Sequence, residues 1–260
     1  MNTLSNVLFD AVIPYHEKDS EILPYCIESL RKNTTGLRNI YIISEAEPDL
    51  DEDFEWIPES AFCFSIDTVG EYIKSTNGRQ GWYYQQLLKF YIHKIIPELL
   101  THYLILDSDV VFIHPIELFN GEKILLDYGG QYVQDYINHM ASILPDVFIN
   151  TTKDVGVTDS MMFRKDIIED LSNRIEVKHK MPMWQALLSH VLPEFYNYSG
   201  MSEYEMYFQF ALLQYPESHE RRFLKKGRGV FLNELQRTDV DVIAFHRWFR
   251  DWQRGLTNNS

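Results

Sequence analysis

The stretch HYLILDSDVVFIHP (residues 102–115) is the most informative part of the chain. Its first half is apolar through residue 106, as in a strand that is buried on both faces of a parallel sheet. Asp107 and Asp109 follow at once, and a second apolar run begins at Val110. In open α/β sheets, ligands bind beyond the carboxyl ends of the strands. Two carboxylates two positions apart on an extended segment point the same way, so we expect Asp107 and Asp109 to share one Mn²⁺ or Mg²⁺ ion.

The segments around this strand alternate between short apolar runs and helical periodicity. That alternation predicts an α/β fold. We expect strands at 7–14, 39–45 and 62–67, helices at 22–33 and 81–100, and an acidic loop at 47–60. Beyond residue 115 the pattern is less regular. We expect an element at 160–171, helices at 181–195 and 202–215, and a tail at 241–255 that opens with a strand-like run.

The charge balance argues against a nucleic-acid-binding protein. The chain has 38 acidic and 24 basic side chains, a formal net charge of -14, and no basic cluster. The N-terminal residues show neither a signal peptide nor a transmembrane segment. We expect Cys26 and Cys63 to be buried free thiols. These features favour a cytoplasmic location, in the bacterial cytosol or in the cytosol of a virus-infected host.

Three motifs resemble glycosyltransferases of the glycosyltransferase A fold. The apolar–D-x-D–apolar pattern is similar to their metal-binding signature. DAVIPYHEKD (10–19) resembles their first strand and nucleotide-binding loop, which places Pro14 and Tyr15 near the donor. GWYYQQLLKF (81–90) resembles a little-characterised bacterial and viral group with a W/Y-x-Q-Q-x-x-K pattern. The matching positions here are Trp82, Tyr84, Gln85, Gln86 and Lys89.

The resemblance implies a Rossmann-like mixed sheet flanked by helices, in a single domain spanning residues 1–260. Residues 1–115 would form the nucleotide-binding half and residues 116–250 the acceptor and catalytic half, with a flexible tail at 251–260. A linker between independent domains is not evident.

The resemblance also implies roles for residues outside the D-x-D segment. Glu203 in SEYEMY (202–207) matches the acidic residue that acts as general base in inverting enzymes of the fold, with Asp159 as the reserve. Ser202 is a credible helix N-cap, and helix-dipole complementarity alone would also explain acids at Glu203 and Glu205. His246 would complete the metal shell.

Donor binding would involve further side chains. Lys89 could contact a phosphate as a point charge or be an ordinary exposed helix lysine, and Arg247 and Arg250 could neutralise the diphosphate. The donor-binding set expected from these arguments is Pro14, Tyr15, Gln86, Lys89, Asp107, Ser108, Asp109 and Arg247.

The implied function is metal-dependent transfer of a hexose or deoxyhexose from a nucleoside diphosphate sugar to the hydroxyl of a glycan or other acceptor. A UDP-sugar is favoured and a GDP-sugar is possible. FHRWFRDW (245–252) lacks the glycine and lysine-proline-tryptophan run of the best-known retaining family, which favours inversion. The alternatives are a retaining enzyme of the same fold and an inactive module that binds nucleotide or carbohydrate.

Overall fold

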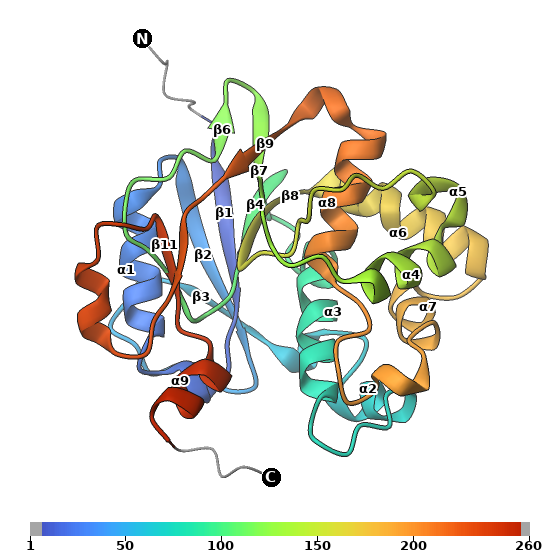
Figure 1. The fold of residues 1–260 in the computed structure, drawn as a ribbon, viewed down its shortest axis with the longest axis horizontal. Helices are drawn as coiled ribbons and strands as arrows, with labels where there is room; N and C mark the ends of the chain where they lie inside the picture. The colour runs from blue at the N-terminus through green and yellow to red at the C-terminus, as the bar shows by residue number, and fades with distance from the viewer. Residues whose placement is uncertain (1–6, 256–260) are drawn as a thin grey trace.

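The computed structural model describes residues 7–255 and is built around a five-stranded mixed sheet (Figure 1). The strand order is β3-β2-β1-β4-β8. The first four strands are parallel, and β8 pairs antiparallel with β4. Their bounds are β1 Phe9–Pro14, β2 Leu37–Ser44, β3 Glu55–Pro58, β4 His102–Leu106 and β8 Ser160–Arg164.

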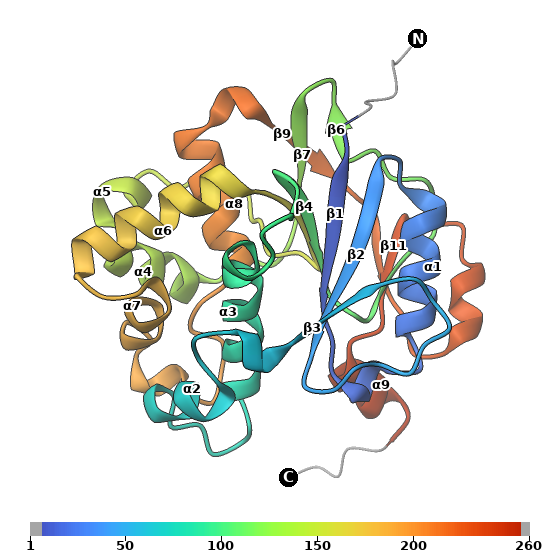
Figure 2. The same cartoon turned by 180° about the vertical axis from the view of Figure 1, so that it is seen from behind.

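Burial explains the apolar runs of the central strands. All of β1 is buried, and so is β4 except for its first residue. Figures 1 and 2 show α1 (Leu23–Asn33) on one side of the sheet and α3 (Gln80–Ile95) on the other. A strand covered on both faces must be apolar on both. The prediction of a mixed α/β sheet flanked by helices is therefore confirmed.

Two three-stranded sheets extend the core. The first has the order β10-β11-β5 and the second β6-β7-β9. Because β11 pairs antiparallel with β5, the C-terminal part of the chain lies directly beside the Asp107–Asp109 turn. The bounds are β5 Val110–Phe112, β6 Phe119–Asn120, β7 Lys123–Tyr128, β9 His219–Phe223, β10 Lys226–Arg228 and β11 Val242–Ala244.

The remaining helices mostly cover the α3 side of the sheet (Figure 2). They are α2 Ile66–Tyr72, α4 Gln134–Ile143, α5 Pro145–Phe148, α6 Lys165–His179, α7 Met183–Ser189, α8 Glu203–Gln214 and, beside α1, α9 Arg247–Gln253. Short 3-10 turns are η1 Glu17–Asp19, η2 Glu59–Ala61, η3 Pro193–Phe195, η4 Pro216–Ser218 and η5 Leu232–Gln236.

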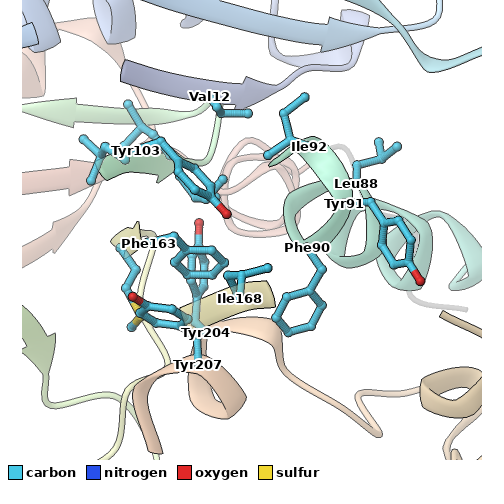
Figure 3. Packing of buried hydrophobic residues seen from close by; sticks show 14 of the residues in the cluster. Val12, Leu88, Phe90, Tyr91, Ile92, Tyr103, Phe163, Ile168, Tyr204 and Tyr207 are labelled. Carbon is cyan, nitrogen blue, oxygen red and sulfur yellow. The ribbon is translucent and has the colours of Figure 1, made fainter. Parts of the chain in front are cut away.

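Helix α8 is a core helix, buried all round from its first residue through Ala211. Aromatic rings attach it to the sheet (Figure 3). Phe163 of β8 stacks on Tyr207 with ring centroids 4.1 Å apart, and also meets Tyr204 edge-on. Because α8 is covered on every side, its first turn is held next to the end of β4, where the Tyr204 hydroxyl lies 3.5 Å from Asp107 Oδ1.

Three sequence predictions are corrected. Residues 62–67 do not form a strand, because Ser65 caps α2 and accepts a hydrogen bond from the Thr68 backbone N–H. The edge strand β3 lies instead inside the stretch expected to be an acidic loop. The helix expected at 181–195 ends at Ser189.

One of the two thiols also differs from prediction, and the flexibility of residues 251–260 stays a prediction. Helix α9 continues through Gln253, so the segment from 251 begins as helix, while residues 256–260 lie outside the described residues. Cys26 is buried as expected, but Cys63 is exposed. None of the helices between residues 7 and 255 has the length and apolarity to cross a bilayer. The cytoplasmic location stays a prediction.

Candidate active site at the carboxyl end of the central sheet

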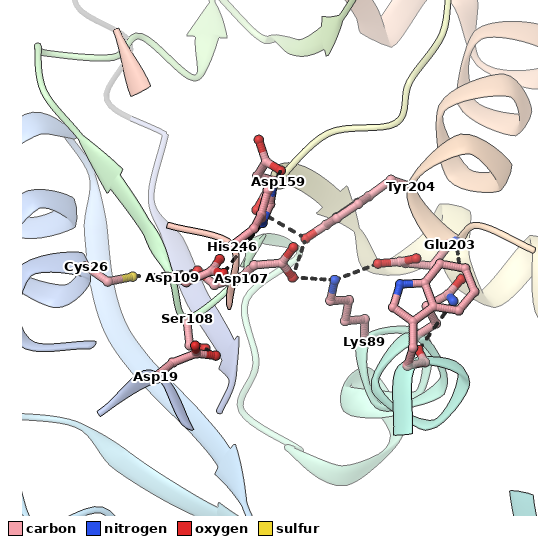
Figure 4. A network of polar contacts seen from close by, with 12 residues as sticks. Asp19, Cys26, Lys89, Asp107, Ser108, Asp109, Asp159, Glu203, Tyr204 and His246 are labelled. Carbon is pink, nitrogen blue, oxygen red and sulfur yellow. Dashed lines mark hydrogen bonds and ion pairs between the residues drawn. The ribbon is translucent and has the colours of Figure 1, made fainter. Parts of the chain in front are cut away.

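The turn between β4 and β5 places two carboxylates at the carboxyl end of the sheet (Figure 4). The Val110 N–H donates to the Asp107 carbonyl at 3.2 Å, which closes the turn. The Asp107 N–H donates to the Asp159 carbonyl at 3.0 Å. This bond ties the turn to the residue that precedes β8. The sequence prediction that Asp107 and Asp109 follow a buried strand is confirmed.

A buried lysine joins the first of these carboxylates to helix α8. Lys89 of α3 lies with its Nζ 2.5 Å from Asp107 Oδ1 and 2.6 Å from Glu203 Oε1. Its side chain is only 3% exposed, so it is not the exposed helix lysine that was one of the two expectations. Burial alone would lower the pKa of Lys89, but the two carboxylates outweigh it and raise that pKa. The lysine is therefore a fixed positive charge inside the site.

Burial and contacts with α3 together determine the surroundings of Asp107 and Glu203. Burial raises the pKa of Asp107 to about 6, although Lys89 opposes the shift. The Glu203 backbone N–H donates to Gln86 Oε1 at 3.0 Å, so Gln86 of α3 holds the first turn of α8. Glu203 is buried, with a side chain 6% exposed.

His246 lies between two other carboxylates. Its Nδ1 is 3.5 Å from Asp109 Oδ2, and its Nε2 is 3.3 Å from Asp159 Oδ1. The Phe245 N–H donates to the Asp109 carbonyl at 2.8 Å, which continues the β5–β11 pairing up to the histidine. Burial alone would lower the pKa of His246, but hydrogen bonds to both carboxylates raise it to about 10. Burial would raise the pKa of Asp159, but the contact with His246 lowers it.

A second buried ion pair was missed by sequence reasoning. Arg250 of α9 donates to Asp19 Oδ1 at 2.8 Å, and Ser108 Oγ donates to Asp19 Oδ2 at 3.0 Å. All three side chains are buried. Asp19 therefore connects the loop after β1, the middle of the D-x-D segment and the C-terminal helix. No local pattern reveals a pair whose members are 231 positions apart.

The other predicted residues divide into those at the site and those away from it. Pro14 ends β1, and the Tyr15 N–H donates to the Ile43 carbonyl at 2.8 Å, so both lie at the carboxyl edge of the sheet. Arg247 is exposed and pairs with Asp251 at 3.1 Å on its own helix. Glu205 does not face Lys89. It accepts hydrogen bonds from the Gly156 N–H at 2.6 Å and from Gln209 Nε2 at 2.8 Å, which gives it a structural role.

A family model matches the part of the chain that contains most residues of this site. The sequence model of a family of unknown function (DUF6492) matches residues 31–253. The chain belongs to this family. The matched range starts after β1 and includes Lys89, the Asp107–Asp109 turn, Glu203 and His246.

The solved structure that is compared with this DUF6492 protein is distant in sequence. No curated protein matches the chain. Among solved structures, the apo form of mouse xyloside xylosyltransferase 1 is similar at a TM-score of 0.46 and 12% sequence identity. The match covers 92% of this chain and 98% of the mouse chain.

The atoms at the Asp109 end of the site could bind a hard cation. They are carboxylate oxygens and an imidazole nitrogen that lie close together. Between residues 7 and 255, however, no three His, Cys, Asp or Glu side chains form a ready-made metal cage. Asp107 already contacts Lys89. Mg²⁺ is usually held by one or two carboxylates together with substrate phosphates, and the DUF6492 site fits that mode through Asp109 and His246.

An open groove of this DUF6492 protein lies elsewhere. It has a volume of about 820 Å³ and is lined by residues that include His102, Lys123, Arg164 and Glu220. His102 begins β4, whereas Asp107 follows the other end of that strand. Since ligands of open α/β sheets bind at the carboxyl ends of strands, the Asp107–Asp109 turn is the better candidate for chemistry.

Proposed function

We propose that this protein is a glycosyltransferase of the glycosyltransferase A fold. It transfers a sugar from a nucleoside diphosphate sugar to an acceptor hydroxyl, with Mn²⁺ or Mg²⁺ as cofactor. A UDP-sugar is the favoured donor, a GDP-sugar the second choice, and the sugar a hexose or deoxyhexose. The acceptor is a glycan or another hydroxyl compound.

One observation carries the proposal. The pairing of β11 with β5 brings His246 to 3.5 Å from Asp109, at the carboxyl end of the parallel strands. The two residues are more than a hundred positions apart in the chain, and nothing in their local sequence requires them to meet. Carboxylate and imidazole ligands at a strand end are suited to hold a cation beside a diphosphate.

The residues have distinct tasks in this proposal. Asp109 and His246 hold the cation, which when bound stabilises charge on the leaving diphosphate. Pro14 and Tyr15 border the donor at the end of β1, and buried Ser108 and Gln86 fix the D-x-D turn and α8. Lys89 keeps Asp107 in place and adds a positive charge near the diphosphate.

Glu203 is the proposed general base. The acceptor oxygen attacks the anomeric carbon, the bond from that carbon to the diphosphate oxygen breaks, and the acceptor proton passes to Glu203. This course inverts the anomeric centre. General-base assistance is worth roughly 10²–10⁴ in rate. Glu203→Gln therefore loses that factor while keeping its affinity for the donor.

One observation favours a retaining course as the second candidate. Glu203 is buried and its Oε1 already accepts from Lys89, so an acceptor reaches it only after a side chain moves. The anomeric configuration of the product, read by proton NMR, separates the two courses. A product of opposite configuration to the donor supports Glu203 as base, and retention removes that role.

The activity itself is tested with a panel of nucleotide-sugars and Mn²⁺, by measuring released nucleoside diphosphate. Wild type releases it from one donor class, Asp109→Asn does not, and Asp239→Asn behaves as wild type. Asp239 is a suitable control because its carboxylate is 63% exposed and pairs only with Arg237 among the described residues. Donor binding without release from any donor would favour the inactive binding module instead.

A further inference from the structure

The orientation of the His246 ring is set from two sides. One ring nitrogen, Nδ1, faces Asp109, and the other, Nε2, faces Asp159 at 3.3 Å (Figure 4). His246 holds a proton on both ring nitrogens in the metal-free site, because its pKa is raised to about 10, and it must release one of them to bind a cation. The resulting neutral imidazole has one N–H donor and one lone pair. It can therefore offer only one nitrogen to a cation, and the other must give its hydrogen to an acceptor.

The two carboxylates are not equivalent. Asp109 belongs to the strand-end pair, whereas Asp159 lies on the segment that leads into β8. The Asp159 backbone is fixed, since its carbonyl accepts from the Asp107 N–H at 3.0 Å and lies 3.5 Å from the Tyr204 hydroxyl. Asp159 is thus a rigid acceptor on the side of the ring that faces away from Asp109.

We infer that Asp159 is a positioning residue that accepts the Nε2–H of His246 and so turns the Nδ1 lone pair toward the cation at Asp109. This inference rests on the proposed function, because it assigns a task within the proposed cation site. Histidine ligands commonly donate their second ring N–H to a carboxylate, which fixes the tautomer and the ring direction. In this role Asp159 neither takes the acceptor proton nor binds the cation directly.

The contact geometry agrees with this role, because the Asp159 carboxylate lies 3.3 Å from Nε2 and a carboxylate is a strong acceptor for an imidazole N–H. Its side chain is 19% exposed and faces His246. A general base would instead have to face the acceptor hydroxyl.

The test measures Mn²⁺ affinity in the presence of UDP by isothermal titration, for wild type, Asp159→Asn, Asp159→Ala, His246→Ala and Asp159→Ala/His246→Ala. Loss of an outer-shell partner of this kind typically lowers metal affinity about 10–100-fold. We expect that loss in Asp159→Ala and a smaller one in Asp159→Asn, whose amide oxygen can still accept. In the double variant, removal of Asp159 should cost nothing beyond the loss already caused by His246→Ala.

Three results would overturn the inference, and each points elsewhere. Full Mn²⁺ affinity in Asp159→Ala together with lost turnover makes Asp159 a catalytic base. A further loss in the double variant makes it a direct ligand. No Mn²⁺ binding by folded wild type, with UDP or GDP, removes the proposed cation site itself. Urea unfolding of each variant shows that the affinities refer to folded protein. Asp159→Asn has a side chain of nearly the same shape as wild type, so it keeps the test valid if Asp159→Ala does not fold.

Discussion

Lys89 shows how a single residue sets the character of the site. Burying an ammonium group is costly unless it is paired and hydrogen-bonded, and here Asp107 and Glu203 both contact Nζ. The ring of Tyr204 lies 4.2 Å from the same atom, a distance suited to a cation–π contact. The lysine thus joins strand, turn and helix through one charge.

Lys89→Met tests that arrangement. It leaves the buried Glu203 carboxylate and the partly buried Asp107 carboxylate without their cation, and breaking a buried pair from one side typically costs about 3–5 kcal/mol. Urea unfolding near neutral pH measures the change. The control is Lys94→Met on the same helix, where the ammonium is 40% exposed and its contact with Glu176 is 3.3 Å. An exposed pair contributes about 0–1 kcal/mol. Equal losses in the two variants would contradict the account.

At the scale of single elements, the segment before β8 is held against α8 by close backbone approach. A Cβ added at Gly156 would lie 2.3 Å from the Cβ of Phe208. The Gly156 N–H also donates to Glu205. The glycine lets the chain pass close to the helix, and that passage leads into the segment that contains Asp159.

Gly156→Ala is therefore expected to destabilise the protein. Overpacking of this kind typically costs about 1–3 kcal/mol. Gly70→Ala is the matched control, because Gly70 is helical and nothing lies within 4 Å of the added Cβ. It should be neutral or stabilising by roughly 0.5–1 kcal/mol. Thermal and urea unfolding compare the two, and a stable Gly156→Ala protein would show that the segment shifts freely.

Elements with strong periodicity could be predicted from the sequence, and those fixed by tertiary contacts could not. The central strands β1, β2 and β4 are covered on both faces, so their apolar runs are long. The edge strand β3 is half-exposed and carries acidic neighbours, so its sequence resembles a loop. Phe62 and Phe64 are buried and imitate a strand, but the Ser65 cap starts a helix.

The residues of the candidate site divide in the same way, into those that the sequence could predict and those that tertiary contacts bring together. Asp107 and Asp109 could be selected because local pattern marks a strand end, and Glu203 because its segment resembles a glycosyltransferase motif at a helix start. The Lys89 bridge, the Asp159–His246 contact and the Asp19–Arg250 pair depend on segments that meet only in the folded chain.

At the scale of the whole molecule, three buried histidines make stability depend on pH. Each of His93, His139 and His219 has one ring nitrogen near a backbone carbonyl oxygen, while the other is buried without a hydrogen-bond partner. Burial lowers the pKa of each from 6.5 to about 4. The unfolded chain therefore takes up protons at a higher pH than the folded protein does.

The sign of the effect follows from this difference. The contribution of these histidines to stability is complete above pH 6.5 and is lost as the pH falls toward about 4. Between neutral pH and about pH 5, each histidine lowers the free energy of unfolding by an amount on the order of 2 kcal/mol. Asp107 has the opposite effect on stability. Its pKa is raised in the folded protein, so its protonation stabilises the folded state as the pH falls through about 6.

Urea unfolding at several pH values measures how much one of these histidines contributes to the pH dependence of stability. His139→Gln should show a smaller loss of stability on acidification than wild type, whatever its stability at neutral pH. His114→Gln is the control, because His114 is only partly buried and its Nε2 lies 3.3 Å from the Thr238 carbonyl oxygen. An unchanged pH slope in His139→Gln would show that folding does not lower the pKa of His139.

The most direct measurement is isothermal titration of wild type with Mn²⁺ and UDP, each alone and each in the presence of the other, with GDP as a second probe. If Asp109 and His246 hold a cation that the diphosphate completes, each ligand must strengthen the binding of the other by the same factor. Asp109→Asn should abolish that coupling. Mn²⁺ and nucleotide that bind independently, or a coupling that survives in Asp109→Asn, would contradict the account.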